Sequence, residues 1–189
     1  MRRQLLVLMI IPFLAIYALS EETKTDTTFI LTLRGNYLRS NDAYYRQIYG
    51  KNKYYPEIEL GVHVYKFLYL RLSYGYLSAE GYTPLLGMRA KSVQHFTSLG
   101  PGIQGKIYGI CYYKFGFGLF LVSYEEEAMG EKVADSSVGY SIDGGLIFKL
   151  FRPIFIETSI RFLTASENLE EVSIDLGGFR AGIGLGVMF

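Results

Sequence analysis

The sequence predicts an all-β fold, an eight-stranded antiparallel up-and-down transmembrane β-barrel with a polar, plugged interior. Three observations predict it. The chain begins with the three parts of a secretory signal, and the remainder contains eight segments with apolar residues at every second position. The connections between these segments alternate between short and long. No later apolar run is long enough to cross a bilayer as a helix.

The composition favours strands and excludes several other classes of protein. The 189 residues include 17 Tyr, 13 Phe and 21 Gly but no Trp, and half are hydrophobic, a mixture typical of β structure. The formal net charge is +1, whereas a nucleic-acid-binding protein usually has a clear basic excess. The single cysteine, Cys111, excludes an intramolecular disulfide framework and is interpreted as a small apolar filler.

Residues 1–20 are interpreted as a cleaved signal peptide. They start with Met1 and two arginines, continue with the apolar stretch Leu5–Leu19, and have the small residues Ala18 and Ser20 at positions −3 and −1 before cleavage after Ser20. Cleavage there leaves 21–189 as one barrel domain. The alternative is a retained membrane anchor, which the short apolar stretch and its interruption by Pro12 disfavour.

The first four strands are expected near 29–36, 57–64, 68–76 and 96–108. Period-two alternation gives each strand one apolar and one polar face. The fourth is the weakest, since Pro101 removes a ladder donor and favours a bulge or a late strand start. The apolar positions of the first three are Phe29, Leu31 and Leu33; Ile58, Leu60, Val62 and Val64; and Leu68, Leu70, Leu72, Tyr74 and Tyr76.

The last four strands are expected near 114–121, 138–149, 156–162 and 179–189. The pair of glycines at 177–178 is a place where the alternation of the last strand can shift. The apolar positions are Phe115, Phe117, Leu119 and Leu121; Val138, Tyr140, Ile142, Leu146 and Phe148; Ile156, Ile160 and Phe162; and Phe179, Ala181, Ile183, Leu185, Val187 and Phe189.

The charged residues of these segments fall on the face opposite the aliphatic ones. Five of these cations placed in hydrocarbon would cost about 10–20 kcal/mol, comparable to the whole stability of a domain. The charged face is therefore expected to line the lumen, where other inward cations, such as Lys106 and Lys149, also find carboxylate partners. The predicted lumen polar network consists of Arg34, Glu57, Glu59, His63, Arg71, Lys114, Asp143, Glu157, Arg161 and Arg180.

The long connections are expected at 39–55, 78–94, 125–136 and 165–171, on the side opposite both chain ends. Eight strands leave a lumen just wide enough for side chains, so a general porin is disfavoured and function is expected in the loops. Loop one, residues 39–55, is the candidate surface-binding loop, for adhesion to a host or matrix surface or contact with lipopolysaccharide. The alternative is a solvated loop whose tyrosines fold over the rim. The candidate binding residues of loop one are Arg39, Tyr44, Tyr45, Arg46, Tyr49, Lys51 and Lys53.

Two other functional classes are weighed against a structural or adhesin-like barrel. A lipid-modifying enzyme needs a serine activated by a histidine, and His95 and Ser98 lie three residues apart, which puts them on opposite faces of a strand. A soluble carrier of the lipocalin type would bury the cations. No metal-ligand cluster or phosphate-binding loop is evident, so we expect a protein without catalytic residues, metal or cofactor.

The carboxyl terminus carries the most specific motif, from Arg180 through Gly182, Leu185 and Val187 to the terminal Phe189. This pattern resembles the assembly signal of bacterial outer-membrane barrels, and the whole mature chain resembles the OmpA/OmpX-type barrel superfamily. The resemblance implies a location in the outer membrane, among its lipids and lipopolysaccharide. It also implies that the barrel-assembly machinery recognises the terminal strand.

Overall fold

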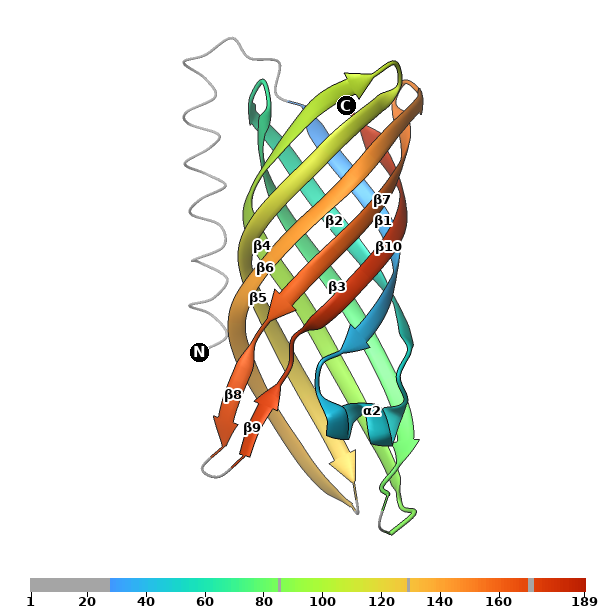
Figure 1. Cartoon of the computed structure of the whole chain (residues 1–189), viewed down its shortest axis with the longest axis vertical. Coiled ribbons are helices and arrows are strands. Elements are labelled where there is room, and N and C mark those ends of the chain that lie inside the picture. The colour runs from blue at the N-terminus through green and yellow to red at the C-terminus, as the bar shows by residue number, and fades with distance from the viewer. Residues whose placement is uncertain (1–27, 85, 129, 170–171) are drawn as a thin grey trace.

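A closed barrel of eight strands dominates the computed structural model, which describes residues 28–189 except 85, 129, 170 and 171 (Figure 1). The predicted signal peptide, 1–20, lies outside the described residues. The barrel strands are β1 (Phe29–Ser40), β2 (Lys53–Tyr65), β3 (Leu68–Tyr82), β4 (Arg89–Tyr108), β5 (Cys111–Ala128), β6 (Glu131–Phe151), β7 (Ile154–Thr164) and β10 (Gly178–Met188). Outside the barrel lie helix α2 (Ala43–Tyr49) and the hairpin of β8 (Ser166–Leu169) and β9 (Val172–Asp175).

Every barrel strand pairs antiparallel with its neighbour in the chain, and β10 pairs with β1 to close the ring. At the closure Leu33 lies opposite Leu185, and the ladder runs without a register shift from Ile30 to Ser40. Closure satisfies the backbone of both terminal strands, which would otherwise present free edges. The predicted eight-stranded antiparallel up-and-down barrel is therefore confirmed.

The alternation read from the sequence sorts side chains between the two faces of the wall. On β1 the outward Leu33 is 61% exposed, whereas the next residue, Arg34, points inward and is 4% exposed. Outward apolar side chains continue around the barrel, including Phe117 on β5, Ile142 on β6 and Ile183 on β10. Successive strand residues point to opposite faces, so the chain has an apolar exterior and a charged interior. None of the helices in the described part of the chain is long and apolar enough to cross a membrane.

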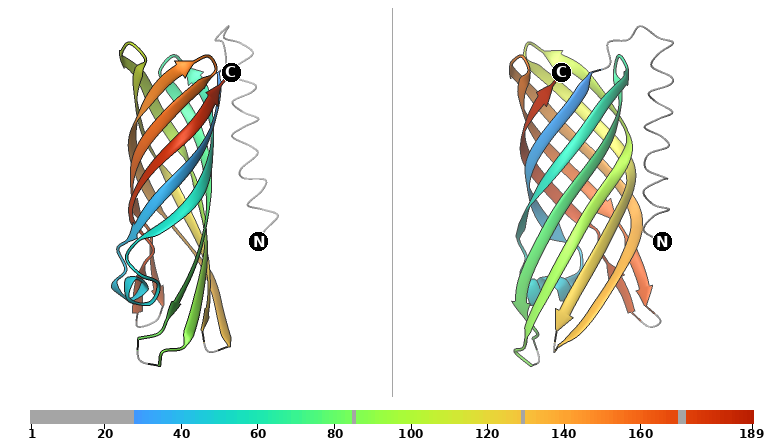
Figure 2. Two further views of the ribbon diagram at one scale, coloured as in Figure 1. Left: turned by 90° about the vertical axis from the view of Figure 1, so that its right-hand side faces the viewer. Right: turned by 180° about the vertical axis from the view of Figure 1, so that it is seen from behind.

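The two ends of the barrel differ. At one end, the turn end, β2–β3, β4–β5 and β6–β7 are joined by two-residue turns, and β1 begins and β10 ends there (Figures 1 and 2). Each of these three turns is accompanied by a register irregularity, between His63 and Tyr65 in the first. The other end, the loop end, carries α2, the β8–β9 hairpin and the long β3–β4 and β5–β6 hairpins. Short turns opposite long loops is the arrangement of transmembrane barrels.

All four predicted loops contain more regular structure than expected. Residues 78–94 and 125–136 are largely extensions of β3–β4 and β5–β6, residues 43–49 form α2, and β8–β9 begins inside 165–171. These extensions carry polar residues on both faces, so they lack the apolar alternation by which strands were recognised. Backbone pairing continues there without that signal.

The fourth strand is present where it was expected, but the bulge or late start suggested by Pro101 was wrong. β4 begins at Arg89, and its register with β3 passes through Leu70 opposite Pro101 without a shift. On the β5 side the ladder has the same register before and after Pro101, so the lost donor is absorbed without a bulge.

The position of a charge on the outer wall is expected to decide whether the barrel assembles. Leu119 on β5 and Val133 on β6 are similarly exposed, at 55% and 57%, but Leu119 lies in the apolar band and Val133 in the polar β5–β6 extension. Leu119→Arg should cost about 2–4 kcal/mol in a bilayer and lower the heat-modifiable, folded fraction in outer-membrane preparations. Val133→Arg is the control and should fold normally; equal losses would mean that the apolar band is assigned wrongly.

Candidate functional site: the lumen ion cluster and loop one

Eight charged side chains from six strands meet in the middle of the lumen, and each residue is almost completely buried. We call this set the lumen ion cluster. It contains four cations and four anions, so its formal charge is balanced. Its members are Arg34 from β1, Glu57 and Glu59 from β2, Arg71 from β3, Lys114 from β5, Asp143 from β6, and Glu157 and Arg161 from β7.

Glu59 is the centre of the cluster. Its carboxylate lies 3.3 Å from Arg34 Nη2 and 3.4 Å from Arg161 Nη2, and it also pairs with Lys114 and, at 3.9 Å, with Arg71. These partners come from four different strands, so Glu59 ties β2 to both neighbouring and distant parts of the wall.

A second set of ion pairs completes the cluster. Glu157 accepts from Arg34 Nη2 at 2.6 Å and from Lys114 Nζ at 3.1 Å. Glu57 pairs with Arg34 and accepts from Arg161 Nη1 at 3.1 Å, and Arg71 pairs with Asp143. Buried charges are tolerated only where opposite charges and hydrogen bonds compensate their desolvation. The geometry supplies every member of the cluster with an opposite charge and fills the lumen with side chains.

The glycines of β10 make room for Arg34. A Cβ at Gly182 would lie 2.7 Å from Arg34 Cδ, and one at Gly184 would lie 2.9 Å from Thr32 Cγ2 and 3.4 Å from Arg34 Cβ. A larger residue at either position would push the β1 side chains away from the cluster. The spacing of inward glycines on β10 therefore has a packing reason.

Arg180 was predicted to join the polar network, but its guanidinium contacts aromatic rings. Its central carbon lies 3.9 Å from the ring centre of Phe96 and 5.0 Å from those of Tyr55 and Phe120. Cation–π contacts of this kind stabilise a desolvated guanidinium. These rings belong to a buried apolar layer on the loop side of the ion cluster, together with Leu38, Leu77, Val122, Leu163 and Ala165. These apolar residues occupy alternate positions that face the lumen, and that spacing was the signal in the sequence that could have identified the layer.

His63 was also predicted to join the network, but it lies nearer the turn end. Its ring packs on Tyr69, with ring centres 5.8 Å apart, and it makes no ion pair with the cluster among the described residues. The distance from the cluster follows from its position, since it is the last inward residue of β2 before the turn.

Loop one folds into a helix that is docked on the barrel extension. Asp42 caps α2 by accepting from the Tyr45 amide at 2.9 Å, and the helix ends at Gly50 with φ +91°, a conformation that favours glycine. Tyr45 and Tyr49 are buried against Ala79 of β3 and against β4. The helix approaches β3 so closely that a Cβ at residue 81 would lie 2.0 Å from the Ile48 carbonyl oxygen.

The helix contact desolvates ionisable groups of loop one and its neighbours. Burial raises the pKa of both the Tyr45 and the Tyr49 hydroxyl, and the carboxylate of Glu126 adds to the rise. Burial also raises the pKa of Glu126 above its usual value, although a hydrogen bond with Ser92 opposes that rise. Charged forms are disfavoured where α2 meets the extension, as expected of a packed interface.

These positions correct part of the predicted binding loop. Tyr45 and Tyr49 are buried and cannot contact a ligand, because they hold α2 in place. Arg46 donates to the backbone oxygens of Ser40 at 2.7 Å and Asn41 at 2.6 Å, so it closes the helix onto the end of β1. The other predicted residues, Arg39, Tyr44, Lys51 and Lys53, are exposed or half-exposed. Together with the neighbouring exposed Tyr54, we call them the exposed face of loop one.

The residues considered for enzyme chemistry do not come together. His95 points outward and its Nδ1 lies 2.7 Å from the Tyr74 hydroxyl, whereas Ser98 points inward and bonds Ser73 at 2.7 Å. Within the described residues no group of His, Cys, Asp or Glu could hold a metal ion.

The terminal motif lies on β10, at the closure of the barrel. Arg180 and Gly182 point inward, and Leu185 and Val187 point outward. Phe189 stacks on Phe29 with ring centres 6.1 Å apart, and the backbones of these two residues exchange hydrogen bonds.

Removing one charge from the lumen ion cluster should be far more costly than removing one from the surface. Glu59→Gln leaves four buried cations facing three anions, and we expect the free energy of unfolding to fall by about 3–5 kcal/mol. Glu125→Gln is the matched control, because Glu125 pairs with Lys132 at 2.6 Å in an exposed position and such pairs contribute little. Urea unfolding in lipid vesicles measures both; similar losses would contradict the role of the cluster.

Docking of α2 should depend on the missing side chain at residue 81. Gly81→Ala places a methyl group against the helix backbone and should increase amide hydrogen exchange across 43–49, because the helix must move away. Gly35→Ala is the control, since nothing lies within 4 Å of the added Cβ. Unchanged exchange in Gly81→Ala would show that the helix is not held in this position.

Comparison with solved structures identifies the fold. OprG from Pseudomonas aeruginosa matches with a TM-score of 0.70 and 13% identity, covering 86% of this chain and 95% of that chain. The N-terminal barrel domain of OprF from the same species matches with a TM-score of 0.56 and 18% identity, covering 87% of this chain and 98% of that domain. Ail of Yersinia pestis, in complex with the heparin analogue sucrose octasulfate, matches with a TM-score of 0.55 and 12% identity, covering 86% of this chain and 97% of that chain.

No protein-family model and no curated protein matches the sequence. The identities to the solved structures are low, so the similarity lies in strand number, closure and topology. The chain therefore has the fold of the small eight-stranded outer-membrane β-barrels, the OmpA/OmpX-type architecture that its sequence resembles.

Proposed function

We propose that this protein is an integral outer-membrane barrel with a closed lumen, and that it binds anionic glycans through the exposed face of loop one. The membrane assignment is carried by one observation: the wall is apolar outside and holds paired charges inside. A soluble carrier would need the reverse arrangement. The fold comparison supports the same location, since the matched structures include outer-membrane proteins.

The filled lumen argues against a general porin. The ion cluster occupies the middle of the barrel, and the layer containing Tyr55, Phe96 and Phe120 covers it on the loop side. Eight-stranded barrels have an interior that side chains fill, whereas aqueous channels need about twice that number of strands. The function is therefore assigned to the ends of the barrel.

The exposed face of loop one has the chemistry of an anion-binding surface. Tyr44 is 75% exposed on the docked helix. The ring of Tyr54 packs on that of Tyr37, with ring centres 5.7 Å apart. Arg39 and Lys51, in the same loop, are also exposed. Tyrosine beside arginine or lysine is favoured at binding surfaces, and the helix holds Tyr44 in place before any ligand arrives. Binding of a sulfated sugar is documented for Ail, which shares this fold.

The partners at assembly follow from β10. We propose that its outward Leu185 and Val187, together with Phe189, are recognised by the barrel-assembly machinery before the ring closes on β1. Closure then hides the backbone edge of β10.

The lipid-modifying alternative is less well supported. The only His–Ser pair considered for it lies on two faces of β4, so the serine lacks an activating base.

Sucrose octasulfate titrated into the folded protein in nanodiscs tests the glycan proposal. We expect saturable binding that weakens about tenfold in Lys51→Gln/Lys53→Gln, equivalent to about 1.4 kcal/mol, and weakens with salt. Lys91→Gln/Lys132→Gln removes the same charge from other hairpins of the loop end and should bind normally.

Equal weakening in the two double variants would mean that binding is non-specific charge attraction, and the loop-one proposal would fail. Absence of binding by the wild-type protein would also reject it, while the membrane assignment would stand on the heat-modifiability measurement.

A further inference from the structure

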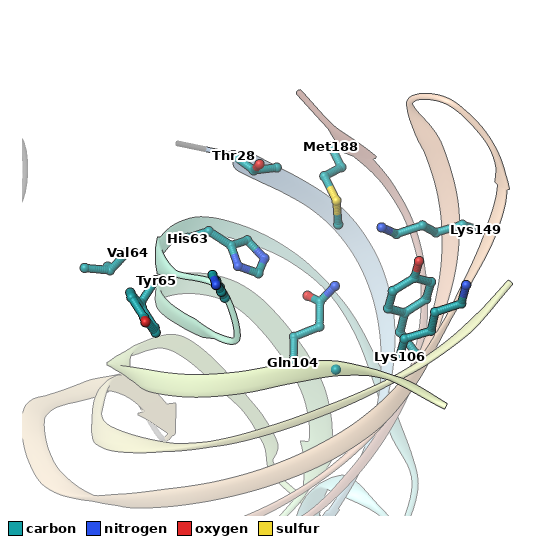
Figure 3. Close-up of a pocket in the computed structure, with 11 residues that line it drawn as sticks. Thr28, His63, Val64, Tyr65, Gln104, Lys106, Lys149 and Met188 are labelled. Carbon is teal, nitrogen blue, oxygen red and sulfur yellow. The ribbon is translucent and has the colours of Figure 1, made fainter. Parts of the chain in front are cut away.

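A polar pocket of about 470 Å³ opens at the turn end of the barrel, inside the rim (Figure 3). Its walls come from β2, β4, β5, β6 and β10, from the β2–β3 turn, and from Thr28 just before β1. Apart from Gly105, the lining residues from β4, β5, β6 and β10 occupy inward positions near the turn end of the barrel. Those that the argument uses are His63, Lys66, Gln104, Lys106, Tyr112 and Lys149.

The charge of this pocket is of one sign. Lys66, Lys106 and Lys149 line it, and no side-chain carboxylate does among the described residues. The surrounding segments, 62–68, 103–113 and 147–155, add Arg152 and contain no Asp or Glu. The sequence predicted that Lys106 and Lys149 pair with lumen carboxylates, but the carboxylates of the lumen ion cluster are taken up by its own four cations.

The pocket is also preorganised. Lys149 Nζ lies 4.1 Å from the centre of the Tyr112 ring, which holds the ammonium at the wall. Gln104 is 6% exposed, and its amide points into the pocket between His63 on one side and Lys106 and Lys149 on the other (Figure 3). Below it, Tyr69 and a buried apolar group that contains Ile147 and Phe155 separate the pocket from the ion cluster. The cationic groups therefore share one small space with a fixed amide donor.

We propose that this pocket binds a phosphate ester group, from an anionic phospholipid headgroup or from a soluble phosphate compound. Lysine ammonium groups bind phosphate as point charges, and an anion removes the mutual repulsion of the cations gathered there. The pocket volume is within the range of small-molecule sites. The site is separate from loop one and does not depend on the glycan proposal.

The position of the rim favours a lipid source. Lys66 lies in the turn between Tyr65 and Phe67, both of which are exposed, and Tyr108 and Phe151 are exposed at the neighbouring turns. Exposed aromatic side chains gather at the level of lipid headgroups. The headgroup phosphates of the adjacent leaflet would then lie beside Lys66 at the edge of the pocket.

The test uses the mature protein in nanodiscs, with the side-chain amide resonance of Gln104 as the readout. Inorganic phosphate is titrated into protein in phosphatidylcholine nanodiscs, and a second series replaces increasing amounts of phosphatidylcholine with phosphatidylglycerol. We expect a saturable shift of Gln104 in at least one series. A shift in the lipid series alone identifies a headgroup site, and a shift with phosphate alone identifies a soluble ligand.

Variants of equal charge make the result specific. Lys106→Gln/Lys149→Gln should weaken the response at least tenfold, whereas Lys91→Gln/Lys132→Gln, at the loop end, should leave it unchanged. The single variant Lys149→Gln serves if the double variant does not regain its heat-modifiable mobility. No shift of Gln104 in either wild-type series overturns the proposal, as does equal weakening by the loop-end variant.

Discussion

The pairing of Glu59 with four cations is the interaction on which the rest of the structure depends. An apolar exterior leaves the lumen as the place for the charges of the wall, and a buried charge must be compensated there. Arg34, Arg71, Lys114 and Arg161 all reach the Glu59 carboxylate from different strands. The inward glycines of β10 follow from the same constraint, since the Arg34 side chain occupies the space next to them.

The cluster and the aromatic layer make the barrel a filled cylinder whose two ends have different chemistry. The loop end mixes acidic and basic residues around a docked helix. The turn end has basic side chains without acidic ones in the segments around its three turns. A wall whose lumen is filled by side chains is a rigid support, and rigid supports commonly present their function on loops and rims. Both proposed binding surfaces lie at such positions.

The fold is shared with proteins that have 18% identity or less. This is physically reasonable, because a barrel wall demands only outward apolar residues, inward residues that fill and compensate the lumen, and a matching register. Many sequences satisfy those demands. These demands do not constrain the residues at the two ends of the barrel. A shared fold therefore does not imply a shared ligand.

The sequence by itself determined the membrane-spanning parts of the eight barrel strands and which of their residues face inward, because the period of two is a local property of a strand. It placed Arg34, Glu59 and Arg161 on the lumen face without knowledge of their partners. The tertiary structure alone decided which inward side chains contact each other, because the height of a side chain along the lumen depends on strand register and tilt. It put Arg180 among aromatic rings, left Lys149 beside Tyr112 away from carboxylates, and buried Tyr49 of a short helix that needs docking on β3 and β4 in addition to its caps.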